Sequence, residues 1–277
     1  MSDHILMLRS EHVYNGDDMD LGLKRKRALV TGSTAGIGLA TAKQLAREGA
    51  FVYINGRTEE RVRKALAEVE GDADGVAADL GTAAGAEKLF QRVKDLDIVV
   101  NNLGIFEARH FLDIGDAEWM RFFEVNVLSG VRMARHYLPR MLERKWGRII
   151  FVSSESALQI PSEMVHYGVT KTAQLAVARG IAESFPASGV TVNSVLAGPT
   201  ASEGVSAFVE GLAKQQGKSR EETERAFFKD ARPTSLLKRF ATTDEVAAMI
   251  VYLCSEPASA TTGSAVRVDG GVVRATV

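Results

Sequence analysis

The chain has 277 residues, which is long enough for one large α/β domain or two small domains with a substantial core. Hydrophobic residues make up 45% and charged residues 25%, as in ordinary soluble globular proteins. The formal net charge of −1 gives no global field that would recruit nucleic acid or an anionic membrane, so we expect neither partner. No apolar stretch reaches the length of a membrane span, and the first ten residues lack the pattern of a secretory signal.

The single cysteine, Cys254, excludes an internal disulfide and a multi-cysteine metal site. It stands in the apolar run 247–254, where we expect a buried structural thiol. This cysteine usage favours a reducing compartment, and we predict a cytoplasmic protein. The five histidines show no metal-ligand spacing, so we predict no catalytic metal.

Residues 1–23 have mixed polarity, and we expect an N-terminal extension that is mobile or packs on a neighbouring subunit. In residues 24–277, short apolar runs alternate with amphipathic segments, without a linker or an internal repeat. The predicted strands are Ala28–Thr31, Phe51–Asn55, Gly75–Ala78, Ile98–Asn101, Ile149–Ser153, Val190–Val195 and Ala265–Val268. The predicted helices are Gly36–Glu48, Glu59–Glu70, Gly85–Lys94, Glu118–Glu143 and Lys171–Phe185. This alternation predicts one α/β domain with a doubly wound parallel sheet of about seven strands and helices on both faces.

A glycine-rich turn, Thr31 to Gly38, directly follows the first predicted strand. Its three glycines permit a tight strand-to-helix turn and the close approach of a pyrophosphate. The helix that begins here presents free N–H groups and the positive end of its dipole to that anion. The turn therefore predicts a Rossmann-type dinucleotide site whose cofactor contacts are Gly32, Ser33, Thr34, Gly36, Ile37 and Gly38.

The residue that selects the cofactor is expected at the end of the second strand, about 20 residues further on. An acid there would bind a ribose 2′-hydroxyl, whereas an arginine would accommodate a 2′-phosphate. The sequence reads Ile54-Asn55-Gly56-Arg57, and the planar guanidinium of Arg57 suits phosphate. We therefore predict NADP(H) as the favoured cofactor, with NAD(H) as the alternative.

Tyr167 and Lys171 are four residues apart, so on a helix both side chains point at the same small volume. An ammonium beside a phenol favours the phenolate, and we expect Lys171 to lower the pKa of Tyr167. A phenol of this kind can exchange a proton with a carbonyl oxygen or an alcohol. The pair alone is a weak signal, and its interpretation depends on the rest of the site.

With these motifs in place, the chain resembles the short-chain dehydrogenase/reductase family over residues 26–273. Leu103 replaces an alanine of the family pattern and Ala197 replaces a proline. The matching motifs are the glycine turn, Asp79-Leu80, Asn101-Asn102-Leu103-Gly104, Asn126, Ser154, Tyr167, Lys171, the loop 197–202 and Val268-Asp269-Gly270-Gly271. The resemblance implies further cofactor contacts at Asp79, Leu80, Asn101, Gly104, Tyr167, Lys171, Pro199, Thr200 and Ser202. It also implies a homotetramer or homodimer built on the two long central helices.

The resemblance implies a catalytic role for four side chains. Tyr167 would be the general acid or base, and Lys171 would stabilise its phenolate and bind the nicotinamide ribose. Ser154 would hold the substrate oxygen, and Asn126 would anchor a water that relays protons to Lys171.

Several of these residues also have structural interpretations. Asp79 could cap the following helix, and Asn101 could hold the sheet edge in addition to a cofactor contact. Ser154 could simply end a strand, and Asn126 could be a satisfied polar group between helices. His166 faces a different side of the helix from Tyr167, and we expect a structural role for it.

The substrate wall is expected from residues 105–109, 155–161 and 200–239. The last segment contains two predicted helices, Glu203–Gln216 and Arg220–Asp230, that would form a lid over the substrate or a hairpin used only in assembly. Glu155 would meet a polar group or face solvent, and the phenylalanines suggest a partly apolar substrate. The predicted substrate contacts are Phe106, Glu155, Ser156 and Phe208.

Together these motifs predict an NAD(P)-dependent oxidoreductase that interconverts a ketone or aldehyde and an alcohol. A 3-oxoacyl thioester, a sugar, a polyol and a steroid all stay open as substrates. The alternative from another class is a dinucleotide-binding sensor or scaffold without catalysis. The presence of all four catalytic residue types favours the enzyme.

Overall fold

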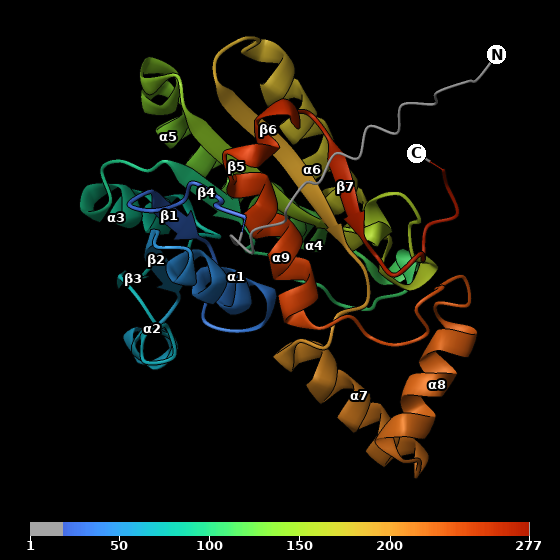
Figure 1. Cartoon of the computed structure of the whole chain (residues 1–277). Coiled ribbons are helices and arrows are strands. Elements are labelled where there is room, and N and C mark those ends of the chain that lie inside the picture. The colour runs from blue at the N-terminus through green and yellow to red at the C-terminus, as the bar shows by residue number, and fades with distance from the viewer. Residues whose placement is uncertain (1–18, 277) are drawn as a thin grey trace, which may run out of the picture.

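A sheet of seven parallel strands in the order β3-β2-β1-β4-β5-β6-β7 organises the molecule (Figure 1). The computed structural model describes residues 19–276, except for the side chains at positions 207, 208, 212 and 214–216. The strands are β1 Arg27–Val30, β2 Phe51–Gly56, β3 Ala73–Ala77, β4 Ile98–Asn101, β5 Gly147–Ser154, β6 Val190–Ala197 and β7 Ala265–Val268. The predicted doubly wound α/β fold with about seven strands is confirmed.

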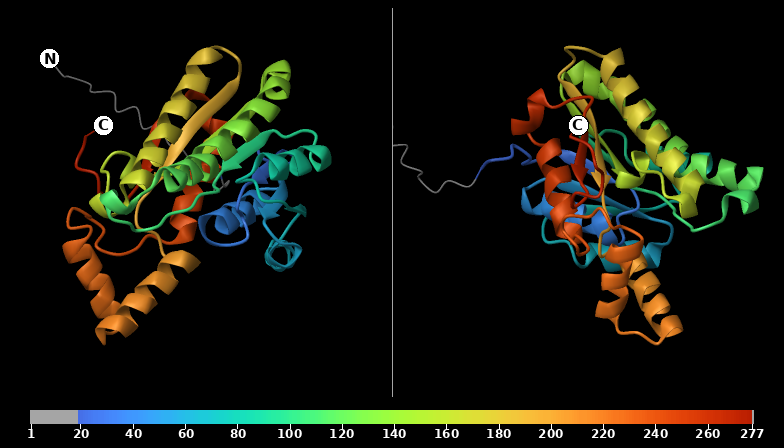
Figure 2. Two further views of the ribbon diagram at one scale, coloured as in Figure 1. Left: turned by 180° about the vertical axis from the view of Figure 1, so that it is seen from behind. Right: turned by 90° about the vertical axis from the view of Figure 1, so that its right-hand side faces the viewer.

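Helices cover both faces of the sheet, and two more extend from one end of the molecule as a V-shaped hairpin (Figures 1 and 2). The helices are α1 Gly36–Arg47, α2 Glu59–Leu66, α3 Ala83–Arg92, α4 Asp116–Phe123, α5 Ser129–Arg144, α6 Val165–Ser184, α7 Glu203–Gln216, α8 Arg220–Asp230 and α9 Thr243–Cys254. Apolar side chains of α1, α2 and α9 form one hydrophobic cluster with the sheet, and those of α3, α5 and α6 form another. The α7–α8 hairpin is the segment in which the sequence predicts a lid.

Polar residues set where several helices begin. Thr82 accepts a hydrogen bond from the Gly85 N–H and caps α3, so the interpretation of Asp79 as that cap is wrong. Thr242 and Glu245 form a capping box at the start of α9, a helix that the sequence analysis did not include. Cys254, at the end of α9, is fully buried, as expected.

Two further boundaries differ from prediction. The long helix expected at 118–143 consists of α4, a π-helical turn at Glu124–Leu128 and α5. Residues 19–23 do not lie apart from the domain, because Leu23 is buried in the core and the Leu21 carbonyl accepts a hydrogen bond from Glu256. The remainder of the predicted extension, residues 1–18, lies outside the described residues.

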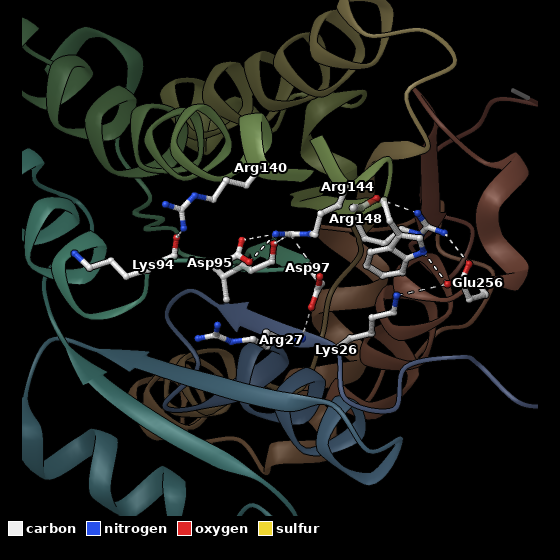
Figure 3. Close-up of polar contacts among 12 residues, drawn as sticks. Lys26, Arg27, Lys94, Asp95, Asp97, Arg140, Arg144, Arg148 and Glu256 are labelled. Atoms are coloured by element: carbon white, nitrogen blue, oxygen red, sulfur yellow. Dashed lines mark hydrogen bonds and ion pairs between the residues drawn. The ribbon is translucent and has the colours of Figure 1, made fainter. Parts of the chain in front are cut away.

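An arginine network ties together the amino-terminal edge of the sheet (Figure 3). Arg148, in β5, is 1% exposed and donates hydrogen bonds to the carbonyls of Ser255, Gly147 and Gly189. Its guanidinium lies 3.7 Å from a carboxylate oxygen of Glu256. This edge is therefore held by buried polar contacts, and the opposite edge of the sheet is left for a ligand site.

The end of the chain folds back on the loop that follows α8. The Leu236 N–H donates to the Gly270 carbonyl at 2.8 Å, and the Thr234 hydroxyl donates to the Val272 carbonyl at 2.5 Å. Gly270 and Gly271 both have positive φ, a conformation that side chains disfavour. The loop after the hairpin is therefore fastened to residues 270–272.

Within the described part of the chain, no helix is both long enough and apolar enough to cross a membrane.

Candidate active site

A cavity of about 980 Å³ opens at the carboxyl edge of the sheet. The strand order reverses between β1 and β4, and such a reversal is where doubly wound folds bind ligands. The wall combines the glycine turn, the ends of β5 and β6, the start of α6 and the α7–α8 hairpin. Segments far apart in the sequence thus meet around one space.

The glycine turn has the shape that a pyrophosphate requires. Gly32 and Gly36 have φ values of 61° and 58°, which side chains disfavour. A Cβ on Gly38 would lie 2.5 Å from the side-chain nitrogen Nδ2 of Asn102 and 2.8 Å from the Gly32 carbonyl oxygen. Ile37 and Gly38 line the cavity at the first turn of α1, where N–H groups have no partner within the helix. This narrow backbone cradle fits the phosphates of a dinucleotide.

Ser33 and Thr34 take different places in this turn. The buried Ser33 hydroxyl donates to the Val30 carbonyl and accepts from the Asn55 N–H, so its side chain joins β1 to β2. The side chain of Ser33 is fully enclosed, and the cofactor contact predicted for this residue stays a prediction. Thr34 lies against the end of β2, where a Cβ on Gly56 would meet its methyl group.

Four further predicted cofactor positions, at residues 57, 79, 80 and 101, lie outside the cavity wall, along the ends of neighbouring strands. Arg57 is exposed directly after β2 and forms no ion pair with any described side chain. Asp79 is exposed and accepts a hydrogen bond from the Gly81 N–H, whereas the Leu80 side chain is buried in the core. The Asn101 amide is buried and has no hydrogen-bond partner among the described residues, and its neighbour Asn102 lines the cavity instead.

Asn126 sits in the π-helical turn, behind the cavity wall, and holds the backbone of the wall residue Ile105. Its fully buried side chain accepts from the Ile105 N–H, donates to the Ile105 carbonyl and donates to the Thr170 hydroxyl. Gly104, which lines the cavity, leaves room there, since a Cβ on it would meet Lys171 Nζ at 3.4 Å. π-Helical turns are frequent at functional sites because they redirect a side chain and free a carbonyl.

Two hydrogen-bond acceptors hold the ammonium group of Lys171. Its ammonium donates to the Val152 carbonyl at 2.9 Å and to the Gln174 side-chain oxygen at 3.3 Å. Burial without a nearby carboxylate lowers the pKa of Lys171 to about 8. Gln174 in turn donates to the Asn126 carbonyl at 2.5 Å, so this side chain joins α6 to the π-helical turn.

Tyr167 lies one helical turn before Lys171, and the ammonium is 5.6 Å from the centre of its ring. Burial raises the pKa of Tyr167, and the negative charge of Glu155 adds to that rise. A hydrogen bond with Ser154 and the positive charge of Arg232 act in the opposite direction. The prediction that Lys171 sets a lowered pKa is therefore wrong in this structure, because desolvation outweighs the effect of nearby charges.

A carboxylate holds the hydroxyl of Ser154. The Ser154 hydroxyl donates to Glu155 at 2.5 Å, and its oxygen accepts from the Ser156 N–H. Glu155 is 5% exposed and pairs at 3.0 Å with Arg232, which comes from the loop after α8. The solvent-facing alternative for Glu155 is therefore excluded, and its polar partner is an arginine in the loop that follows the hairpin.

The outer wall of the cavity is largely apolar. The ring of Phe106 lies edge-on to Tyr167, with 6.3 Å between the ring centres. The side chain of Phe208 lies outside the described part of α7. Other wall residues are Met164, Pro199, Thr200, Ser202, Val205, Val209 and Phe227, together with Ser156 beside the serine.

Three residues of this site were not predicted from the sequence. Gln174 is three residues after Lys171 on the same helix, and that spacing is a signal that could have found it. Asn102 stands in a quoted motif, and its amide donates to the carbonyls of Thr31 and Gly32. Nothing in the sequence marks Arg232, which reaches the site only through the path of the hairpin.

His166 stays outside the cavity although it is next to Tyr167. Its ring packs 4.0 Å from that of Phe122, and burial lowers its pKa. Neither ring nitrogen has a hydrogen-bond partner among the described residues. Among those residues, no group of three or more histidine, cysteine or acidic side chains is placed to hold a metal ion.

The chain is similar in sequence to known proteins. The family model described as "Enoyl-(Acyl carrier protein) reductase" matches residues 32–273. The uncharacterized oxidoreductase YvaG of Bacillus subtilis is 48% identical over 261 residues, which span 92% of this chain and 99% of that protein. The 3-oxoacyl-[acyl-carrier-protein] reductase of Aquifex aeolicus is 30% identical over 262 residues, which span 92% of this chain and 100% of that protein.

The structures agree with the sequences. L-Sorbose reductase from Gluconobacter frateurii, solved with NADPH and L-sorbose, superposes with a TM-score of 0.88 at 30% identity, covering 93% of this chain and 100% of that one. The region that the family model matches contains strands β2 to β7, the three glycines of the turn and the Tyr–Lys helix α6. On these grounds the chain belongs to the short-chain dehydrogenase/reductase family of oxidoreductases.

Proposed function

We propose that the protein is an NADPH-dependent reductase of a ketone or aldehyde, reversible with the corresponding alcohol. The observation that carries this proposal is the convergence of Ser154, Tyr167 and Lys171 on a cavity that begins at a dinucleotide-type glycine turn. A bound nicotinamide would supply the hydride there. The residues of the chain would orient the carbonyl and supply the proton.

Three side chains would share the proton chemistry. Tyr167 would donate its phenolic proton to the carbonyl oxygen, because it lies at the cavity surface beside Ser154. Ser154 would hold the same oxygen through its hydroxyl. The ammonium of Lys171, which Val152 and Gln174 hold in place, would stabilise the resulting phenolate and bind the cofactor ribose.

Arg57 supports the preference for NADPH. It is exposed at the end of β2, where a 2′-phosphate would lie, and its guanidinium forms no ion pair with described side chains. L-Sorbose reductase, solved with NADPH, also supports this choice. Asp79 and Asn101 would line the same cofactor groove further along the sheet edge.

The α7–α8 hairpin would act as the substrate lid, since Val205, Val209 and Phe227 close the outer side of the cavity. The similarity to a keto-sugar reductase and to a 3-oxoacyl thioester reductase makes these the first two substrate classes to test. The apolar outer wall suits a substrate with an apolar portion beside its carbonyl group.

A carbonyl panel tests the reaction. Loss of reduced nicotinamide absorbance would be followed with L-sorbose, an acetoacetyl thioester and simple ketones, using NADPH and NADH in parallel. We expect NADPH-dependent reduction, and equal use of NADH would contradict the role of Arg57. The Tyr167→Phe variant should lose roughly 10²- to 10⁴-fold in rate because it lacks the acid, whereas full activity would refute the assignment.

We further propose a cytoplasmic homodimer or homotetramer. Exposed apolar side chains on the central helices, Met120 on α4, Leu128 in the π-helical turn and Phe185 at the end of α6, support an interface there. Light scattering tests this point, and a monomer at micromolar concentration would contradict it.

A further inference from the structure

The link between the hairpin and the serine runs through two buried side chains. Arg232 is 11% exposed as a side chain, and its Nε donates to one oxygen of Glu155 at 3.0 Å. The other oxygen of Glu155 accepts a hydrogen bond from the Ser154 hydroxyl at 2.5 Å. Arg232 also lies 3.4 Å from Glu163 and 5.8 Å from the ring centre of Phe227. The guanidinium group of Arg232 is therefore held by contacts on several sides.

The Ser154 hydroxyl has one proton and two acceptor sites. In this structure the proton goes to Glu155, and one acceptor site takes the Ser156 N–H. A carbonyl substrate that needs the proton of Ser154 must therefore compete with Glu155 for it. How strongly Glu155 holds that proton depends on how much of its charge is compensated.

Arg232 supplies that compensation. A carboxylate beside the position of a developing oxyanion opposes the reaction unless a cation neutralises it. Glu155, Lys171 and Arg232 are charged side chains of the cavity wall around Ser154 and Tyr167. Further along the wall are Glu107, Glu163, Lys218 and Asp230. Arg232 pairs directly with Glu155.

We propose that Arg232 is a positioning residue of the lid: by pairing with Glu155 it releases the Ser154 proton for the substrate and makes the serine depend on lid closure. This inference rests on the proposed carbonyl reduction for its kinetic consequences. Its structural part, the fastening of the hairpin to the serine loop, stands independently. The catalytic contacts stay with Ser154, Tyr167 and Lys171.

The variants Arg232→Met, Glu155→Gln and their combination test the proposal by kinetics. Arg232→Met leaves the carboxylate uncompensated, so kcat should fall by about tenfold or more with a smaller change in KM. Glu155→Gln removes that charge, and the double variant should therefore be faster than Arg232→Met alone. A double variant no faster than Arg232→Met would overturn the proposal, because removal of the uncompensated carboxylate would then have restored nothing.

The pH profile of reduction gives a second readout. Reduction falls as the pH rises through the pKa of the acid Tyr167. Glu155 raises that pKa and Arg232 lowers it, so Arg232→Met should move the midpoint up and Glu155→Gln should move it down. Shifts in the same direction, or none, would contradict the proposed charge compensation.

Amide hydrogen exchange tests the fastening without any substrate. In both single variants, residues 220–232 should exchange at least roughly threefold faster than in the wild type, because the hairpin loses its anchor. The control is Arg220→Met, which removes an exposed pair with Glu210 in the same hairpin and should leave kcat unchanged. Exchange no faster than in this control would refute the anchor. If the wild-type protein reduces no carbonyl, the proposed function fails, while this experiment still decides the anchor.

Discussion

Burial governs the proton affinity of the residues at the centre of the site. The ammonium of Lys171 has two neutral acceptors and no nearby carboxylate, so its charge is poorly compensated when the cavity is dry. The two partners of the predicted Tyr–Lys pair shift in opposite directions for the same reason, because each loses solvation of its charged form. Burial therefore shifts the two pKa values more than the proximity of the two side chains does.

Lys171 should leave a mark on the pH dependence of stability. Its pKa is about 8 in the folded protein and 10.5 otherwise, so between these values the unfolded chain holds a proton that the folded chain lacks. The free energy of unfolding should therefore gain roughly 3 kcal/mol as pH rises through this window, and the full penalty applies below pH 8.

The Lys171→Met variant isolates this contribution. Denaturant titrations at pH 7 to 10.5 should show a stability difference between wild type and variant that changes by roughly 3 kcal/mol across the window. Other buried groups, Cys254 among them, titrate equally in both proteins and cancel in the difference. Parallel curves for the two proteins would show that the lysine is not desolvated.

Among the elements, the glycine turn depends on close backbone contacts. Gly38→Ala would place a methyl group 2.8 Å from the Gly32 carbonyl oxygen, so the turn must open. We expect NADPH affinity, followed by nicotinamide fluorescence, to fall by roughly tenfold or more. The matched control is Gly211→Ala in α7, where an added Cβ meets nothing within 4 Å and affinity should be retained. Equal affinity of Gly38→Ala and wild type would contradict the cradle.

Most of these elements follow from local sequence patterns. The seven strands and the glycine turn were predictable because apolar runs and glycine spacing are local signals. The π-helical turn around Asn126 was not, because its hydrogen bonds depend on contacts with the Ile105 loop and α6. Arg232 was not predictable for a similar reason, since 77 residues separate it from Glu155 and only the hairpin geometry brings them together.

At the scale of the whole molecule, the amino-terminal edge of the sheet depends on the hydrogen bonds of one buried arginine, Arg148. Arg148→Met should destabilise the protein by roughly 3 kcal/mol, because it leaves the buried carbonyls of Ser255 and Gly147 without this donor. Thermal unfolding should show a fall in Tm of roughly 6–12 °C for a chain of this length. The control, Arg47→Met, removes an exposed pair with Glu70 and should change stability by less than about 1 kcal/mol. A Tm equal to that of the control would contradict a stabilising role for the buried contacts of Arg148.

The attachment of the loop after α8 to residues 270–272 has a consequence for how this molecule can vary. The hairpin is connected at its start to strand β6, and the loop after it is hydrogen-bonded to residues 270–272. Changes near the C-terminus therefore act on the mouth of the cavity from outside, without touching any group that handles the substrate. The two segments form one mechanical unit, and an exchange of the hairpin between relatives should carry the C-terminal stretch with it.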